Sequence, residues 1–182
     1  MAVDWSIECP LISGVLMQAT PPAYAEERKV HWEHVIGILQ PGEVIGSGPE
    51  QVTGSDRVWV ARSGHAHVHL ASGEFHYKVK GLLLATGNGS AASDLGTTGG
   101  VTQVKGTLVC DLDGSAGGGN SVLTDTESAV LSQGGHVERT GHMVVPTVCT
   151  TESDNIFLIR IADPASSADQ WIAAGIGRGE RQ

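Results

Sequence analysis

The side chains best suited to chemistry in this sequence are the histidines between residues 65 and 76. Side chains of a β-strand alternate between its two faces, so His65, His67 and His69 share one face. Imidazole nitrogens are preferred ligands of divalent first-row metals, and a nearby carboxylate such as Glu74 adds an oxygen ligand. Histidine also titrates near neutral pH, so His69 and Glu74 are candidate catalytic residues for a cofactor-free acid–base reaction.

The sequence predicts that these residues belong to a β-hairpin with a two-residue turn at Ser72–Gly73. In that register His69 lies opposite His76, and His67 lies opposite Lys78. Apolar residues then fall on one face of the hairpin and polar residues on the other, and a shift of one residue would lose this separation. The polar face holds His65, His67, His69, Glu74 and His76.

His67, His69, Glu74 and Gly81 have the spacing His-x-His-x4-Glu-x6-Gly. This pattern resembles the first metal-binding motif of the cupins, which are β-barrel proteins that hold iron, manganese, zinc or nickel. The resemblance implies metal ligation by His67, His69 and Glu74. It also implies a further histidine ligand, for which the candidates are His76, His136 and His142.

Two features favour an ordinary solvated surface over a metal site. The second cupin motif, Pro-x-Gly-x2-His-x3-Asn, is absent. In the predicted register Lys78 lies directly opposite His67, where its positive charge would repel a bound cation. A hairpin that is buried on one side shows one apolar and one polar face whatever its function.

The sequence therefore favours a β-scaffold module without a catalytic metal. Such a module binds a small ligand or a partner, or it forms a homo-oligomeric assembly. The alternative is a cupin-like metal-dependent enzyme that acts on a small organic substrate through a divalent metal (Fe, Mn, Zn or Ni). No cofactor is expected under the favoured interpretation.

Composition narrows the partners. The chain has 182 residues with 11 Lys and Arg against 20 Asp and Glu, for a formal net charge of −9. A nucleic acid or an anionic membrane surface needs a basic footprint, so neither is expected to bind. The first residues carry Asp4 and Glu8 where an export signal would be basic, so a cytoplasmic location is the default and an extracytoplasmic one stays open.

The elements that must position the histidines are strands. Alternation and Gly/Pro turns predict a single all-β domain over residues 30–176, a sandwich or small barrel of about eight strands with little helix. Residues 1–29 form an apolar N-terminal arm that covers a neighbouring copy or the chain's own core, and residues 177–182 form a flexible tail. Strands are expected at 57–71, 74–85, 101–112, 121–126, 136–145, 155–162 and 170–176. Residues 30–39 fit a helix or a strand, and their β-branched content favours the strand.

Two further patterns leave alternatives open. Cys110 ends one expected strand and Cys149 follows another, so they form either a disulfide or two buried free thiols. Asp111, Asp113 and Asn120 suggest calcium, but their loop lacks the twelve-residue acidic spacing of a calcium-binding hand.

Overall fold

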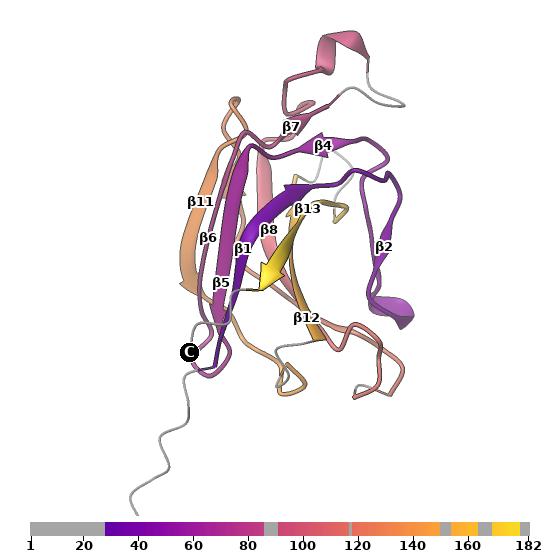
Figure 1. Ribbon diagram of the computed structural model, residues 1–182, viewed down its shortest axis with the longest axis vertical. Helices are drawn as coiled ribbons and strands as arrows, with labels where there is room; N and C mark the ends of the chain where they lie inside the picture. Colours follow the sequence, from indigo (N-terminus) through magenta and orange to yellow (C-terminus); the bar gives the residue numbers. More distant parts are fainter. Residues whose placement is uncertain (1–27, 86–90, 117, 150–153, 164–168, 179–182) are drawn as a thin grey trace, which may run out of the picture.

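A computed structural model describes residues 28–85, 91–116, 118–149, 154–163 and 169–178 (Figure 1). The expected N-terminal arm lies outside the described residues except for its last two. In the described part of the chain, no helix is long and apolar enough to cross a membrane. The strands are β1 Lys29–Gly37, β2 Val44–Ile45, β3 Val52–Thr53, β4 Trp59–Val60, β5 Ser63–His69, β6 Glu74–Lys80, β7 Leu83–Leu84, β8 Gln103–Cys110, β9 Val122–Asp125, β10 Ala129–Val130, β11 Val137–His142, β12 Asn155–Ile161 and β13 Trp171–Arg178. Two 3-10 helices are η1 Gly48–Glu50 and η2 Ala92–Asp94.

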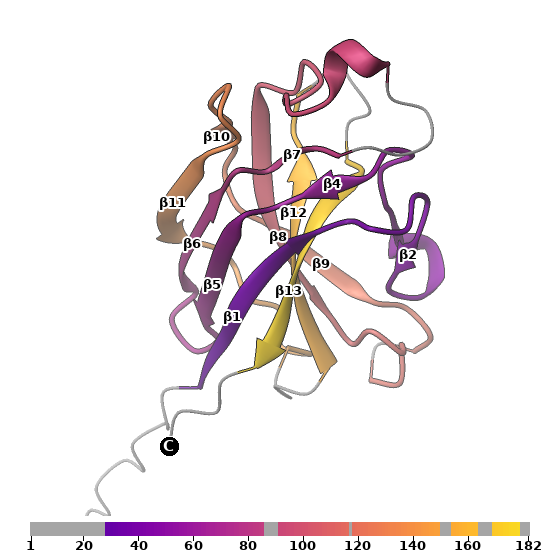
Figure 2. The same cartoon turned by 45° about the horizontal axis from the view of Figure 1, so that its top comes forward.

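The main sheet is antiparallel and curls into a half-barrel (Figures 1 and 2). Its strand order is β10-β8-β12-β13-β1-β5-β6-β11, and β9 pairs with the remainder of β8. The two ends of the sheet approach each other, because the Thr124 hydroxyl on β9 donates to the Val144 backbone carbonyl oxygen beyond β11 at 2.8 Å. The expected all-β sandwich or barrel is therefore confirmed.

Aromatic rings fill the inside of the curl. Tyr77 and Phe157 have ring centroids 5.5 Å apart, and Phe157 lies 5.7 Å from Trp32, so rings from β6, β12 and β1 meet in the centre. These side chains are almost fully buried. Gly106 on β8 makes room for them, since a Cβ there would lie 2.4 Å from the Phe157 ring. The interior is thus a packed apolar core.

The β5–β6 hairpin exists, but its predicted register is wrong. Its loop spans residues 70–73, and His67 lies opposite His76 while His65 lies opposite Lys78. The predicted pairs His69–His76 and His67–Lys78 are therefore displaced by two residues. Because the displacement is an even number, the histidines keep the face that alternation assigned to them.

Gly73 explains the longer turn. Its N–H donates to the His69 carbonyl oxygen at 2.7 Å, and its φ of 77° lies in the left-handed region that glycine enters readily. Its own carbonyl accepts the Met143 N–H at 2.9 Å. A Cβ on Gly73 would lie 2.1 Å from the Met143 carbonyl oxygen, so this residue ties the turn to the end of β11.

The expected single strand over 57–71 is also wrong, because it is interrupted between Val60 and Ser63. Before the interruption the side chains face the opposite way to the expected alternation, since Trp59 is fully buried and Val60 is 42% exposed. The Trp59 N–H donates to the Ile38 carbonyl oxygen, and β4 pairs with β7 in a separate two-stranded sheet. The expected strand over 74–85 divides into β6 and β7 for the same reason.

Residues 30–37 belong to the strand β1, as the β-branched content of residues 30–39 favoured, and residues 38 and 39 follow its end. The alternation of buried and exposed residues is interrupted within β1, because the consecutive residues Glu33 and His34 are both exposed. This interruption gives the apolar residues of the strand a spacing that resembles that of a helix. The remaining expected strands correspond to β8, β9, β11, β12 and β13. β13 continues to Arg178, two residues into the expected tail.

Cys110 and Cys149 form a disulfide, which settles the open alternative. The bond joins the end of β8 to the segment after β11 across a sequence separation of 39 residues. Both cysteines are buried. The cross-link therefore limits the unfolded chain over a long loop.

Replacing both cysteines by serine should lower the free energy of unfolding by about 4 kcal/mol, from the loss of loop-closure entropy. For a chain of this length the melting temperature should fall by about 10 °C. Thermal unfolding with and without a reducing agent measures this. The melting temperature of the parent should fall by a similar amount when the disulfide is reduced. A double variant whose melting temperature still responds to the reducing agent would contradict the Cys110–Cys149 disulfide.

Candidate functional site

Six of the eight histidines lie on the outer face of β1, β5, β6 and β11. Strand pairing places His31 opposite His67, His67 opposite His76, and His76 opposite Thr140. On one side of this row Lys29 is opposite His69 and Glu74 is opposite His142. On the other side Lys78 lies between His65 and Glu138. We call this surface the histidine face; it consists of Lys29, His31, Glu33, His65, His67, His69, Glu74, His76, Lys78, Glu138, Thr140 and His142.

The histidine face points away from the core. The residues that alternate with it, Ala66 and Val68 on β5 and Phe75 and Tyr77 on β6, are buried inside the curl. His65, His67, His69 and His76 are half-buried at the outer surface. These side chains therefore do not form an enclosed site inside the barrel.

The imidazoles lie close enough to interact. Ring centroids are 5.3 Å apart for His67 and His76, and 5.3 Å apart for His65 and His76. The separations are 6.1 Å for His67 and His69, and 6.3 Å for His31 and His67. Because strand neighbours hold both β5 and β6 on each side, the backbone positions of these rings are fixed by hydrogen-bonded ladders.

Burial and neighbouring charges disfavour protonation of two of these imidazoles, His65 and His67. Burial, together with smaller effects of Lys29 and the neighbouring histidines, lowers the pKa of His67 to about 4. Burial also lowers the pKa of His65, together with the charges of His76, His31 and Lys78, against an opposing effect of Glu138. Both side chains are therefore neutral at pH 7.

Glu138 balances the positive charge on β6. Its carboxylate accepts a hydrogen bond from Lys78 Nζ at 2.5 Å, and its other oxygen lies 3.3 Å from His76 Nε2. These two contacts hold the pKa of Glu138 below its usual value. The sequence did not indicate this residue, since only the pairing of β11 with β6 brings it to the face.

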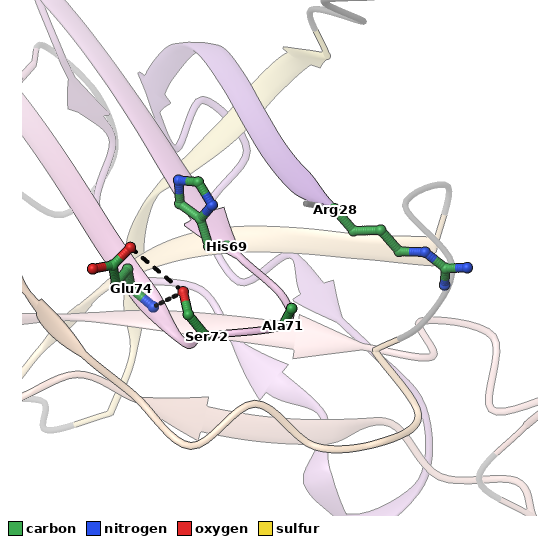
Figure 3. Close-up of a pocket in the computed structure, with 5 residues that line it drawn as sticks. All are labelled: Arg28, His69, Ala71, Ser72 and Glu74. Atoms are coloured by element: carbon green, nitrogen blue, oxygen red, sulfur yellow. Dashed lines mark hydrogen bonds between the residues drawn. The ribbon is translucent and has the colours of Figure 1, made fainter. Parts of the chain in front are cut away.

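Two shallow depressions of about 240 Å³ lie at the ends of the histidine face. The first is lined by Arg28, His69, Ala71, Ser72 and Glu74 (Figure 3). The second is lined by Glu33, His34, Ser63, Gly64, His65, Lys78 and Lys80. In the first, the Ser72 hydroxyl hydrogen-bonds to Glu74, and Arg28 extends away from both (Figure 3).

The candidate catalytic pair, His69 and Glu74, lies at the two ends of the β5–β6 turn and lines one depression. Glu74 contacts Ser72, and its carboxylate lies 3.6 Å from His142 Nε2. His69 borders the same depression from the other side of the turn. The register that pairs Val68 with Phe75 brings the next residues, His69 and Glu74, to facing positions at the turn, and Lys29 of β1 lies on the other side of His69.

The ligands implied by the cupin motif are brought onto one surface but do not converge. His67 and His76 are directly opposed, whereas Glu74 pairs with His142. His136 lies elsewhere, where its Nδ1 accepts the Gly81 N–H at 3.2 Å. Within the described ranges, these residues do not bring three ligand atoms within 4.8 Å of one another.

A cluster of three aspartates does bring its ligand atoms within this distance of one another. Oxygen atoms of Asp111, Asp113 and Asp154 lie within 4.8 Å of one another. Burial raises the pKa of Asp154, and the charges of Asp113 and Asp111 add to the effect. Two of the three residues were in the calcium pattern, but Asp154 replaces Asn120. Asp154 is more than forty residues away from Asp113 in the chain, so no local signal points to it.

Comparison with known proteins gives no match among protein-family models, curated proteins or solved structures. The functional argument for this chain therefore rests on its own residues and their geometry.

Acidification should destabilise the protein through His67. Between pH 6.5 and 4 the unfolded chain takes up a proton at this residue that the folded chain does not, so the free energy of unfolding falls as the pH falls. Solvent screening on the half-exposed face limits the contribution to about 1 kcal/mol. Urea unfolding between pH 4 and 7, with a chelator present, should show a smaller pH dependence for His67→Gln. Identical pH dependence in both proteins would refute this.

Proposed function

We propose that this chain is a β-scaffold binding module that associates with a second copy of itself through the histidine face. The proposal rests on the order of charges along the strands. On β1, Lys29 and Glu33 lie on either side of His31. On β6, Glu74 and Lys78 lie on either side of His76. The sign of the charge therefore reverses along each strand about the same central row.

Such a pattern is complementary to itself. Consider a two-fold axis that lies in the interface, perpendicular to the strands, along the row from His31 to Thr140. It brings Lys29 opposite Glu33 of the second copy, and Glu74 opposite Lys78 of the second copy. An isologous interface requires this kind of self-complementarity, and matched charges fix its orientation.

The β11 strand follows the same rule. His142 and Glu138 flank Thr140, so the same axis brings the imidazole of one copy opposite the carboxylate of the other. Glu33 belongs to this arrangement because it lines one depression together with His65 and Lys78. Three strands thus contribute complementary pairs about one axis.

The shape of the surface supports a macromolecular occupant over a small one. Small-molecule sites are usually concave cavities of about 300–1,000 Å³ lined mainly by apolar groups. The two depressions on the histidine face are smaller, at about 240 Å³ each, and charged side chains line them. A polar outer surface without a deep cavity is better suited to another protein surface.

The alternative, a cupin-like metal-dependent enzyme, has less support. Its ligands would have to converge in a cavity that excludes water and orients a substrate. Here the interior is occupied by Tyr77, Phe157 and Trp32, and the motif residues face outward. The geometry therefore favours a binding module.

A charge exchange on β1 tests the proposed dimer. Lys29→Glu and Glu33→Lys should each weaken self-association about tenfold, because each substitution places like charges together twice across the two-fold axis. The double variant should return to within about threefold of the parent, since it restores both pairs with reversed sign. Sedimentation equilibrium of the full chain over a range of concentrations measures the dissociation constant.

Glu50→Lys is a matched control, because Glu50 is exposed on η1 and its substitution makes the same charge change as Glu33→Lys outside the histidine face. It should leave the dissociation constant unchanged. A parent that stays monomeric to about 1 mM, where binding would contribute only about 4 kcal/mol, would overturn the proposal. A double variant as weak as the single variants would overturn it too.

A further inference from the structure

His76 lies between two histidines of the neighbouring strand. His67 is directly opposite, His65 is diagonal to it, and each has its ring centroid 5.3 Å from that of His76. Both rings are inclined by 50° to the ring of His76. Two imidazoles that share a tetrahedral metal ion through bonds of about 2.0–2.1 Å bring their centroids to about 5 Å. The observed spacing is close to that of a chelating pair on either side of His76.

We propose that His65, His67 and His76 bind a divalent transition-metal ion, Zn²⁺, Ni²⁺ or Cu²⁺, on the outside of the sheet. Water occupies the remaining coordination position. This ligand set differs from the one that the cupin resemblance implies, because it leaves out His69 and Glu74 and takes His65 instead. All three ligands come from one chain, so the site does not depend on the proposed dimer.

The backbone already holds the three residues in place. β5 is paired with β1 and β6, and β6 is paired with β5 and β11, so neither strand is an edge. The nitrogens of the three rings do not lie within 4.8 Å of one another in the structure, so metal binding requires the side chains to rotate about χ1 and χ2 toward one position. The three side chains are half-buried at the outer surface, so this rotation changes their contacts with neighbouring side chains and leaves the backbone in place. A site on regular strands keeps its geometry better than one on a loop.

Glu138 provides the second requirement of a histidine site. Its carboxylate oxygen lies 3.3 Å from His76 Nε2, and a carboxylate at this distance orients a ligating imidazole and raises its basicity. The same carboxylate holds Lys78 at 2.5 Å. The positive charge of Lys78, which counted against a metal in the sequence, is thereby paired.

The donor set selects the class of metal. Imidazole suits Zn²⁺, Cu²⁺ and Ni²⁺, whereas Mg²⁺ and Ca²⁺ prefer oxygen ligands. Affinity should therefore follow the general order in which Cu²⁺ binds more tightly than Ni²⁺ or Zn²⁺. Mg²⁺ at the same concentration should not compete.

Titration calorimetry of the chelator-treated full chain with ZnCl2 and NiCl2 tests the site. We expect one ion per chain, and His76→Gln and His65→Gln should each weaken binding about tenfold or more through the loss of a ligand. His34→Gln, which removes one of the two histidines outside the histidine face, should change the affinity less than about threefold. His69→Gln and Glu74→Gln should behave like His34→Gln.

Circular dichroism and thermal melting of each variant separate loss of a ligand from loss of the fold; if one of the two ligand variants unfolds, the other carries the test. Absence of binding below about 1 mM metal, or parent-like affinity in both His76→Gln and His65→Gln, would overturn the site. Equal losses in His69→Gln and Glu74→Gln would also overturn it and indicate the cupin-type ligand set. Metal binding that persists in the Glu50→Lys control and in a monomeric Lys29→Glu variant would show that the metal site does not require the proposed dimer.

Discussion

The hydrogen-bonded register of β1, β5, β6 and β11 is the constraint on which the rest of the surface depends. Side chains of paired strands lie about 5 Å apart, so the register decides which groups are neighbours. Gly73 helps to set the β5–β6 and β6–β11 pairings. Its N–H donates to the His69 carbonyl oxygen and closes the β5–β6 turn, and its carbonyl oxygen accepts the Met143 N–H beyond β11. A side chain at this position would collide with the Met143 carbonyl. One glycine therefore aligns the strands that carry His67, His76 and Glu138.

The packed interior explains why the chemistry lies outside. The rings of Trp32, Tyr77 and Phe157 meet at the centre of the curl, and Gly106 is small enough to let them approach β8. β12 is buried along nearly its whole length, whereas β5 and β6 are buried on alternate residues only. The half-barrel thus has one polar face in the described part of the chain on which many titratable groups are gathered on regular strands.

The two proposals use different aspects of that surface. Self-association depends on charges that reverse along β1 and β6 about the central row. Metal binding depends on the short distance between the rings of His76 and its two neighbours on β5. Glu138 is relevant to both, because it pairs with Lys78 and contacts His76. The two proposals also share residues, because the proposed two-fold axis follows the row that contains His67 and His76.

The sequence by itself determined the all-β class, most strands and the separation of the hairpin into an apolar and a polar face, because alternation is a local property of each strand. Only the tertiary structure decided which strands lie next to one another. It brought His31 and Glu138 to the histidine face, joined Cys110 to Cys149, and placed Asp154 beside Asp111. It also replaced the expected His69–His76 pair by His67–His76. These features depend on the left-handed backbone of Gly73 and on hydrogen bonds between distant segments, and neither is encoded in a residue's immediate neighbours.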